Sequence, residues 1–139
     1  MKQIVVIMWA CSIMLGACKK SSTNQQPIVE PVNPNAPVLV SGSFTGNMGY
    51  QVSGTASIVN DNGTKRLVFK NFSSNNGPDL KVYLATTKQA GAFISLGNLK
   101  STGGQQVYDI SGMPDFAQHK FVLIWCQQFS VLFGAAEIK

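Results

Sequence analysis

The sequence predicts an all-β fold, a single antiparallel domain of the β-sandwich or barrel-like type that follows a lipidated, disordered tether. Three observations predict this fold class. Short apolar stretches alternate with polar residues, Gly/Asn/Pro-rich turns separate them, and no window of helix length shows a 3.6-residue period. The chain has 139 residues, so once the N-terminal segments are set aside about 100 remain, enough for one domain.

Residues 1–17 are expected to be a signal peptide. Lys2 supplies a positive charge, and 4–15 is a mainly apolar run that is too short to span a bilayer but suits the core of a secretory signal. The run ends in Leu15-Gly16-Ala17-Cys18, which resembles the lipobox of bacterial lipoproteins. That resemblance implies lipid on Cys18 and a protein anchored in the cell envelope, periplasmic or surface-facing. The alternative is a soluble secreted protein cut near Ala17.

Residues 18–41 are expected to be a lipidated, flexible linker. A polar run at 21–26 is followed by four of the chain's six prolines, between residues 27 and 37. Such a composition does not bury enough apolar surface to order a chain. Lys19 and Lys20 lie beside the anchor, where they can meet anionic lipid.

The β domain is expected to span 42–139. Residues 51–59 alternate between apolar and polar side chains, and Asn60-Asp61-Asn62-Gly63 is a tight-turn sequence that leads into a partner strand at 65–72. A second turn at 75–78 precedes a half-buried strand at 80–85. A short strand at 94–99, which Gly97-Asn98 can interrupt, and a strand at 105–110 after Gly103-Gly104 follow.

The stretch Phe121–Cys126 contains no polar side chain and is rich in β-branched and aromatic residues. This composition favours a strand that is buried on both faces, although a short buried helix remains the alternative. Residues 112–120 before it are expected to form a loop or a single helical turn, and a last strand is expected at 131–138. Gln127-Gln128 breaks the apolar run, so Cys126 lies where its thiol can reach the surface.

Residue inventory excludes most catalytic sites. With one histidine, His119, a zinc site of two or three histidines is impossible, and no metal centre is expected. No nucleophile elbow, phosphate loop or dinucleotide motif occurs. The β domain has no basic stripe interleaved with aromatic residues, so nucleic acid is not an expected partner. These absences argue against a classical enzyme.

Cys126 is the candidate site residue, because Cys11 leaves with the signal and Cys18 carries lipid. It is either a small apolar core residue, or a redox thiol or axial thiolate to a haem-type group. His119 is a possible source of positive charge near it. Asp79 fits a turn residue better than a catalyst, and Trp125 points to the opposite face as a core aromatic. Tyr83, on the outward phase of its strand, is a weak candidate for sugar stacking.

Several motifs resemble one known family, the DM13 domain. They are Gly42-x-Phe44, Val52-Ser53-Gly54-Thr55-Ala56, Asn76-Gly77-Pro78-Asp79-Leu80-x-Val82-Tyr83-Leu84, Leu96-Gly97-x-Leu99-Lys100, Gly104-x-Gln106-x-Tyr108 and Trp125-Cys126-x-x-Phe129. The resemblance covers the chain from Gly42 to about Lys139. This family is regarded as an electron-transfer domain, found beside DOMON domains in animal surface proteins and alone in bacterial lipoproteins.

The resemblance implies a β-sandwich-like domain outside the cytoplasm whose redox role centres on Cys126, as a bare thiol or as a ligand to haem. It also implies an unidentified redox or surface partner protein. One position departs from the family, whose members often carry a histidine where this chain has Tyr50-Gln51. The alternative function is a non-catalytic module that binds a glycan or a protein on its sheet face.

Overall fold

The computed structural model describes residues 25–139, so the signal peptide expected at 1–17 and the expected lipidation site Cys18 lie outside the described residues. The described chain folds into nine β-strands and confirms the all-β prediction. In chain order they are β1 (Ile28–Val29), β2 (Val38–Gly46), β3 (Val52–Asp61), β4 (Thr64–Ser74), β5 (Leu80–Ala85), β6 (Phe93–Asn98), β7 (Gly103–Asp109), β8 (Phe121–Cys126) and β9 (Val131–Glu137).

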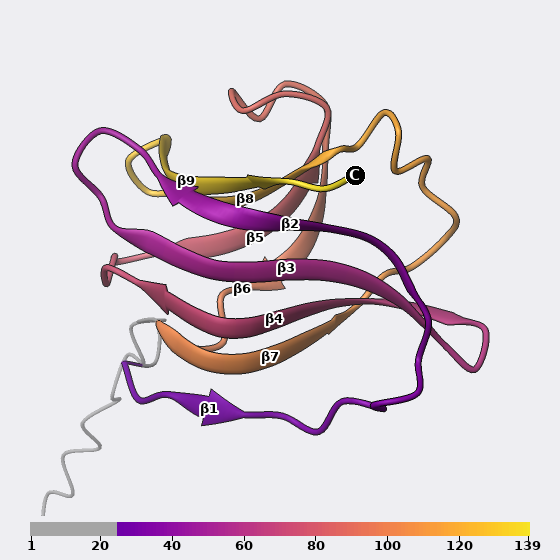
Figure 1. Ribbon diagram of the computed structural model, residues 1–139. Helices are drawn as coiled ribbons and strands as arrows, with labels where there is room; N and C mark the ends of the chain where they lie inside the picture. Colours follow the sequence, from indigo (N-terminus) through magenta and orange to yellow (C-terminus); the bar gives the residue numbers. More distant parts are fainter. Residues whose placement is uncertain (1–24) are drawn as a thin grey trace, which may run out of the picture.

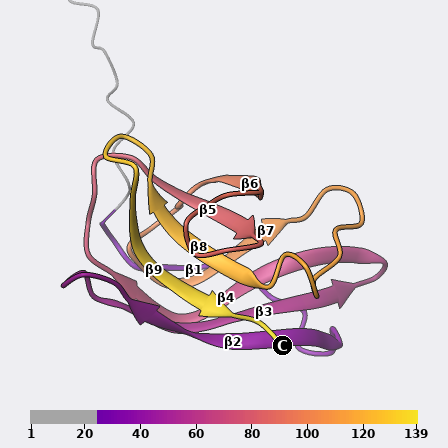
Figure 2. The ribbon, with the colours of Figure 1, turned by 90° about the horizontal axis from the view of Figure 1, so that it is seen from above.

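All nine strands belong to one sheet, in the order β1-β7-β4-β3-β2-β9-β8-β5-β6. Neighbouring strands are antiparallel except β1 and β7, which are parallel. The sheet curls strongly, so that the half formed by β7, β4, β3 and β2 faces the half formed by β9, β8 and β5 (Figures 1 and 2). The last strand, β9, lies between β2 and β8 and joins the two halves.

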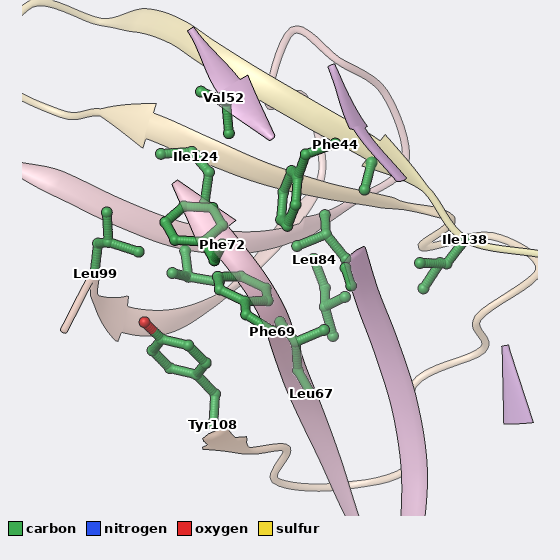
Figure 3. Packing of buried hydrophobic residues seen from close by; sticks show 14 of the residues in the cluster. Phe44, Val52, Leu67, Phe69, Phe72, Leu84, Leu99, Tyr108, Ile124 and Ile138 are labelled. Carbon is green, nitrogen blue, oxygen red and sulfur yellow. The ribbon is translucent and has the colours of Figure 1, made fainter. Parts of the chain in front are cut away.

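The main hydrophobic core fills the inside of the curl. Phe44 of β2 meets Phe69 and Phe72 of β4 edge-on, with ring centroids 5.0 and 5.3 Å apart. Aliphatic residues such as Leu84 and Ile124 approach from the other half of the sheet (Figure 3). The edge-to-face aromatic contacts stabilise one half of the sheet, and burial of Leu84 and Ile124 in the same cluster joins the other half to it.

The outer face of β5, β8 and β9 carries a second, smaller core. It consists of Tyr83, Ala85, Leu123 and Ala135, with Phe121, Trp125 and Leu132 packed against them. Strand β8 is therefore buried on both faces, as its composition predicted, and its bounds are those predicted from the sequence. Tyr83 is only 4% exposed and its ring stacks on Phe93 at 4.1 Å, so its expected role as an exposed sugar-stacking residue is wrong.

The predicted hairpin turn between β3 and β4 is confirmed. Asn62 and Gly63 both have positive φ values, 52° and 88°, as a tight two-residue turn requires. The Asn60 side chain accepts a hydrogen bond of 3.1 Å from the Gly63 N–H. Asn and Gly tolerate this backbone region at little cost, which is why the sequence identified the turn.

The chain is ordered before the predicted domain boundary, and the expectation of disorder up to Ser41 is wrong for residues 25–41. Strand β1 pairs with β7, and β2 already begins at Val38. The Glu30 N–H donates a hydrogen bond of 2.9 Å to the Gln105 carbonyl. The Glu30 carboxylate accepts a hydrogen bond of 2.6 Å from the Val107 N–H. Without this segment β7 would present an open edge of unpaired backbone groups, which explains why proline-rich chain is held there.

Candidate functional site: a buried thiol beneath a loop rim

Four loops gather at one end of the sheet, and we call them the rim: residues 47–51, 75–79, 99–102 and 127–130. Main-chain hydrogen bonds join them to one another and to the adjoining strands. Asn75 N–H donates to the Gln51 carbonyl at 3.0 Å, and Gln127 N–H donates to the Asp79 carbonyl at 2.9 Å. Asn47 N–H reaches the Phe133 carbonyl at 2.9 Å. Strand β1 also starts at this end, on the left in Figure 1.

Cys126 lies directly beneath the rim, as the last residue of β8. It pairs with Leu80 of β5 and Val131 of β9, and the turn 127–130 follows it. Its side chain is 0% exposed and belongs to the main core. It is the only cysteine among residues 25–139, and it is unpaired. The expectation that this thiol reaches the surface is therefore wrong, because β8 carries it one residue short of the polar turn.

Asp79 is brought close to Cys126 by the pairing of Leu80 with Cys126. The Asp79 main-chain carbonyl accepts a hydrogen bond from the N–H of Gln127, the residue after Cys126. The Asp79 carboxylate lies 2.7 Å from the Lys81 Nζ. Both side chains are mostly buried, and Lys81 also donates to the Asn98 side chain. Asp79 thus closes the rim over Cys126 in the way expected of a turn residue.

His119 is not near Cys126. It lies in the loop before β8, where its N–H donates to the Asp115 carbonyl at 2.8 Å. The five steps of strand from Phe121 to Cys126 span about 17 Å, so His119 is at the opposite end of the sheet. It contributes no charge at Cys126.

Trp125 points away from Cys126, as strand alternation predicted. It packs, half-buried, against the second core on the outer face, whereas Cys126 points into the main core. The two residues are adjacent in sequence but belong to different cores. Trp125 therefore stabilises β8, the strand that contains Cys126.

The residues around Cys126 do not fit a haem group. The sulfur has no exposed surface, and the chain's one histidine lies at the far end of the sheet. Tyr50, one of the two residues Tyr50-Gln51 at which the sequence was expected to lack a family histidine, stacks on Phe133 with ring centroids 3.8 Å apart. Among residues 25–139 no cluster of three or more His, Cys, Asp or Glu side chains is arranged to hold a metal ion.

Beside the rim, a buried polar network that sequence reasoning missed holds the loop 99–102. The side chains of Gln106 and Ser101 are both 0% exposed. Gln106 Nε2 donates to the Ser101 carbonyl at 2.8 Å, and its Oε1 accepts the Tyr108 hydroxyl at 2.6 Å. Burial raises the pKa of Tyr108 well above its usual value, so the phenol stays protonated and keeps donating. The only sequence signal for this network was the two-residue period of the strand, which places Gln106 and Tyr108 on one face of the sheet.

An open groove of about 480 Å³ lies beside the second core, along β2 and β9. Its lining combines residues of both strands, Glu137 among them, with Lys88 and Lys139. No residue proposed from the sequence as a site lies in it.

In the described part of the chain, no helix is long and apolar enough to cross a membrane.

One comparison with known proteins gives a match. The family model described as Electron transfer DM13 matches residues 43–138, which is most of the chain. No curated protein and no solved structure matches the chain. The matched residues include Cys126 and all four rim loops.

Proposed function

Because the chain belongs to the electron transfer DM13 family, we propose that it is an electron-transfer domain that works outside the cytoplasm, held at the cell envelope by lipid on Cys18. The family match carries this proposal, since it spans nearly all of the described domain. The ending Leu15-Gly16-Ala17-Cys18 supports the anchor. Acylation at one cysteine with two or three chains is enough for stable attachment.

We place the redox centre at Cys126. Among residues 25–139 it is the only thiol, and a single turn separates it from solvent. The exchange would proceed by attack of the Cys126 thiolate on a disulfide of the partner, which forms a mixed disulfide and releases one partner thiolate. One thiolate of a donor dithiol then attacks the Cys126 sulfur of the mixed disulfide and releases the second partner thiolate. The other thiolate of the donor attacks the new mixed disulfide, which restores Cys126 and leaves the donor as a disulfide. Two electrons thereby pass from the donor thiols to the original disulfide.

This chemistry requires the turn 127–130 to open, because the sulfur has no exposed surface. The turn is closed by a hydrogen bond of 3.3 Å from Ser130 N–H to the Gln127 carbonyl, and Ser130 has a φ of 52°. A non-glycine residue in this region makes the turn easier to open than the paired strands. Exposure of Cys126 also requires loss of the hydrogen bond from Gln127 N–H to the Asp79 carbonyl, because Cys126 lies at the rim end of the main core.

The experiment measures reaction of the mature, lipidated protein with oxidised glutathione in mild detergent, followed by intact mass. The expected result is one glutathione per chain, added faster than global unfolding measured in parallel by urea extrapolation. Cys126→Ala should add none. Modification that proceeds only at the rate of global unfolding would show that Cys126 is a core residue and would contradict its role as the centre.

A second candidate function is a non-catalytic module for glycans or proteins, favoured by the groove along β2 and β9. Lys88 and Lys139 would contact an acidic glycan there. The test is binding of an acidic polysaccharide by the full chain, compared with Lys88→Ala. Binding that is lost in this variant, in a protein whose Cys126 is unreactive, would favour the module over the redox domain.

A further inference from the structure

The ordered domain begins close to the anchor. Between Cys18 and the first described residue, Gln25, the chain advances only seven residues, which span at most about 25 Å. From Gln25 onward the chain is fixed to the domain. The Thr102 hydroxyl donates to the Gln25 carbonyl at 3.2 Å, and the Ser101 hydroxyl donates to the Gln26 carbonyl. An anchor at Cys18 therefore holds the domain near the bilayer by its rim.

The rim carries little charge. The charged residues of its four loops are Asp79 and Lys100, and each is in an ion pair, Asp79 with Lys81 at 2.7 Å and Lys100 with Glu30 at 2.8 Å. The remaining loop residues are uncharged. Paired charges cost less to bring against a low-dielectric surface than isolated ones do. The rim is therefore suited to contact with lipid.

Two large apolar side chains project from the rim. Met48, in the loop between β2 and β3, is 85% exposed, and Phe129, in the turn between β8 and β9, is 62% exposed. Both loops lie on the left in Figures 1 and 2, at the end where β1 begins. Exposed apolar side chains on uncharged loops insert readily at the boundary between headgroups and acyl chains.

The opposite end of the sheet has a different character. Its loops and the C-terminus carry charges that include Asp61, Lys65, Lys88, Asp115, Lys120 and Lys139. Met113 is also exposed there, at 86%, so exposure of a methionine alone does not distinguish the two ends. The ten residues of β3 separate the ends by about 30 Å, which puts Met113 far from the anchored end.

We propose that the rim docks on the lipid bilayer, with Met48 and Phe129 seated in the interface and the charged end directed toward solvent. This inference rests on the anchoring at Cys18 in the proposed function, and on the short chain between the anchor and the domain. The lipid on Cys18 provides one membrane signal, and the two apolar loops provide a second. Docking places Cys126, beneath the same rim, at the membrane surface.

The test uses the mature, lipidated protein in a Cys126→Ala background, reconstituted in vesicles of phosphatidylethanolamine and phosphatidylglycerol. Single cysteines at Met48→Cys and Phe129→Cys carry an environment-sensitive fluorophore, and Met113→Cys is the matched control. Lipids bearing a nitroxide on the acyl chain should quench the fluorophore at 48 and 129 by severalfold, with a blue-shifted emission. The fluorophore at 113 should show neither change.

Flotation of the same vesicles separates docking from anchoring. If the protein floats with the vesicles but none of the three fluorophores is quenched appreciably, the rim does not dock. The lipid anchor on Cys18 is then still supported. If the mature protein does not float, the anchoring in the proposed function is wrong and the docking fails with it. Equal strong quenching at 48, 129 and 113 would show a domain lying flat on the bilayer and would overturn the upright arrangement.

Discussion

Tyr108 and Gln106 meet inside the core, where the Tyr108 hydroxyl donates a hydrogen bond of 2.6 Å to the Gln106 Oε1. Gln106 in turn bonds both backbone groups of Ser101, accepting its N–H at 3.3 Å and donating to its carbonyl at 2.8 Å. One buried amide thus ties strand β7 to the loop that precedes it. No buried side-chain nitrogen or oxygen within residues 25–139 lacks a hydrogen-bond partner.

Replacing Gln106 by alanine should destabilise the domain strongly. The substitution leaves the Tyr108 hydroxyl and the Ser101 backbone groups without their buried partner, and each unsatisfied group costs about 1–3 kcal/mol. We expect the free energy of unfolding in urea to fall by about 3 kcal/mol. The control is Gln118→Ala at an exposed loop position, which should stay within about 0.5 kcal/mol of the wild type. Equal effects of the two substitutions would contradict the network.

Tyr108 should make the domain sensitive to alkali. Burial, the largest cause, raises the pKa of Tyr108; the Lys100 N–H lowers it and Glu30 raises it further. The folded state therefore binds the phenol proton more tightly than the unfolded state. Its contribution is complete below the unfolded pKa of about 10 and is lost as pH rises through the folded pKa, at up to about 1.4 kcal/mol per pH unit.

The measurement is the free energy of unfolding in urea as a function of pH for wild type and Tyr108→Phe. Above about pH 10 the variant should lose stability less steeply than the wild type, because the titrating group is gone. Gln118→Ala, at an exposed loop position, leaves every phenol in place and should keep the wild-type slope. Parallel curves for wild type and Tyr108→Phe would refute the assignment.

Cys126→Ser should destabilise the domain more than Cys126→Ala. Alanine leaves a small cavity and should cost about 1 kcal/mol, whereas serine places a hydroxyl in the main core and should cost about 2–3 kcal/mol. Urea unfolding of both variants measures the difference. A serine variant as stable as the wild type would mean that water reaches this position in the folded state.

Glu30→Gln should loosen the segment 25–31 without unfolding the domain. The substitution removes the charge that pairs with Lys100 at 2.8 Å and weakens the acceptor of the Val107 N–H. The Lys100 side chain is 40% exposed and the Glu30 side chain is 32% exposed. Solvent screening therefore limits the contribution of this ion pair to about 0–1 kcal/mol of stability.

Hydrogen exchange is the measurement for Glu30→Gln. The Val107 amide and the amides of β1 should exchange faster, while those of β8 keep wild-type rates. Glu137→Gln, which breaks the more exposed pair with Lys120, is the control and should leave β1 unchanged. Unchanged exchange at Val107 in Glu30→Gln would show that the segment is held by other contacts.

Local chemistry determined which elements could be predicted from the sequence. The apolar run Phe121–Cys126 gave the bounds of β8, and Asn62-Gly63 gave the turn between β3 and β4. Strand β2 was missed as an element because its first residues, Val38 and Leu39, follow a proline-rich stretch and remain exposed. The chain before β2 is held by pairing of β1 with distant β7, and Val38 and Val40 pair with β3, neither of which a local pattern contains.

The candidate site was predicted less well, for the same reason. The alternation in β5 placed Tyr83 outward, correctly, but the stacking of Phe93 and the side chains of the second core bury that outward face. The polar residues after Cys126 suggested exposure, but the loop at 75–79 closes over it through the Asp79–Gln127 hydrogen bond. In both cases a segment distant in sequence covers the residue.

The position of β9 has a consequence for the order in which the protein can be made. It is the last strand in the chain, yet it lies between β2 and β8 and is the only link between the two halves of the described sheet. Until the ribosome has released residues 131–137, the halves share no hydrogen-bonded strand. During synthesis from the N-terminus, the sheet therefore cannot close before the C-terminus emerges, so folding of the domain is completed late.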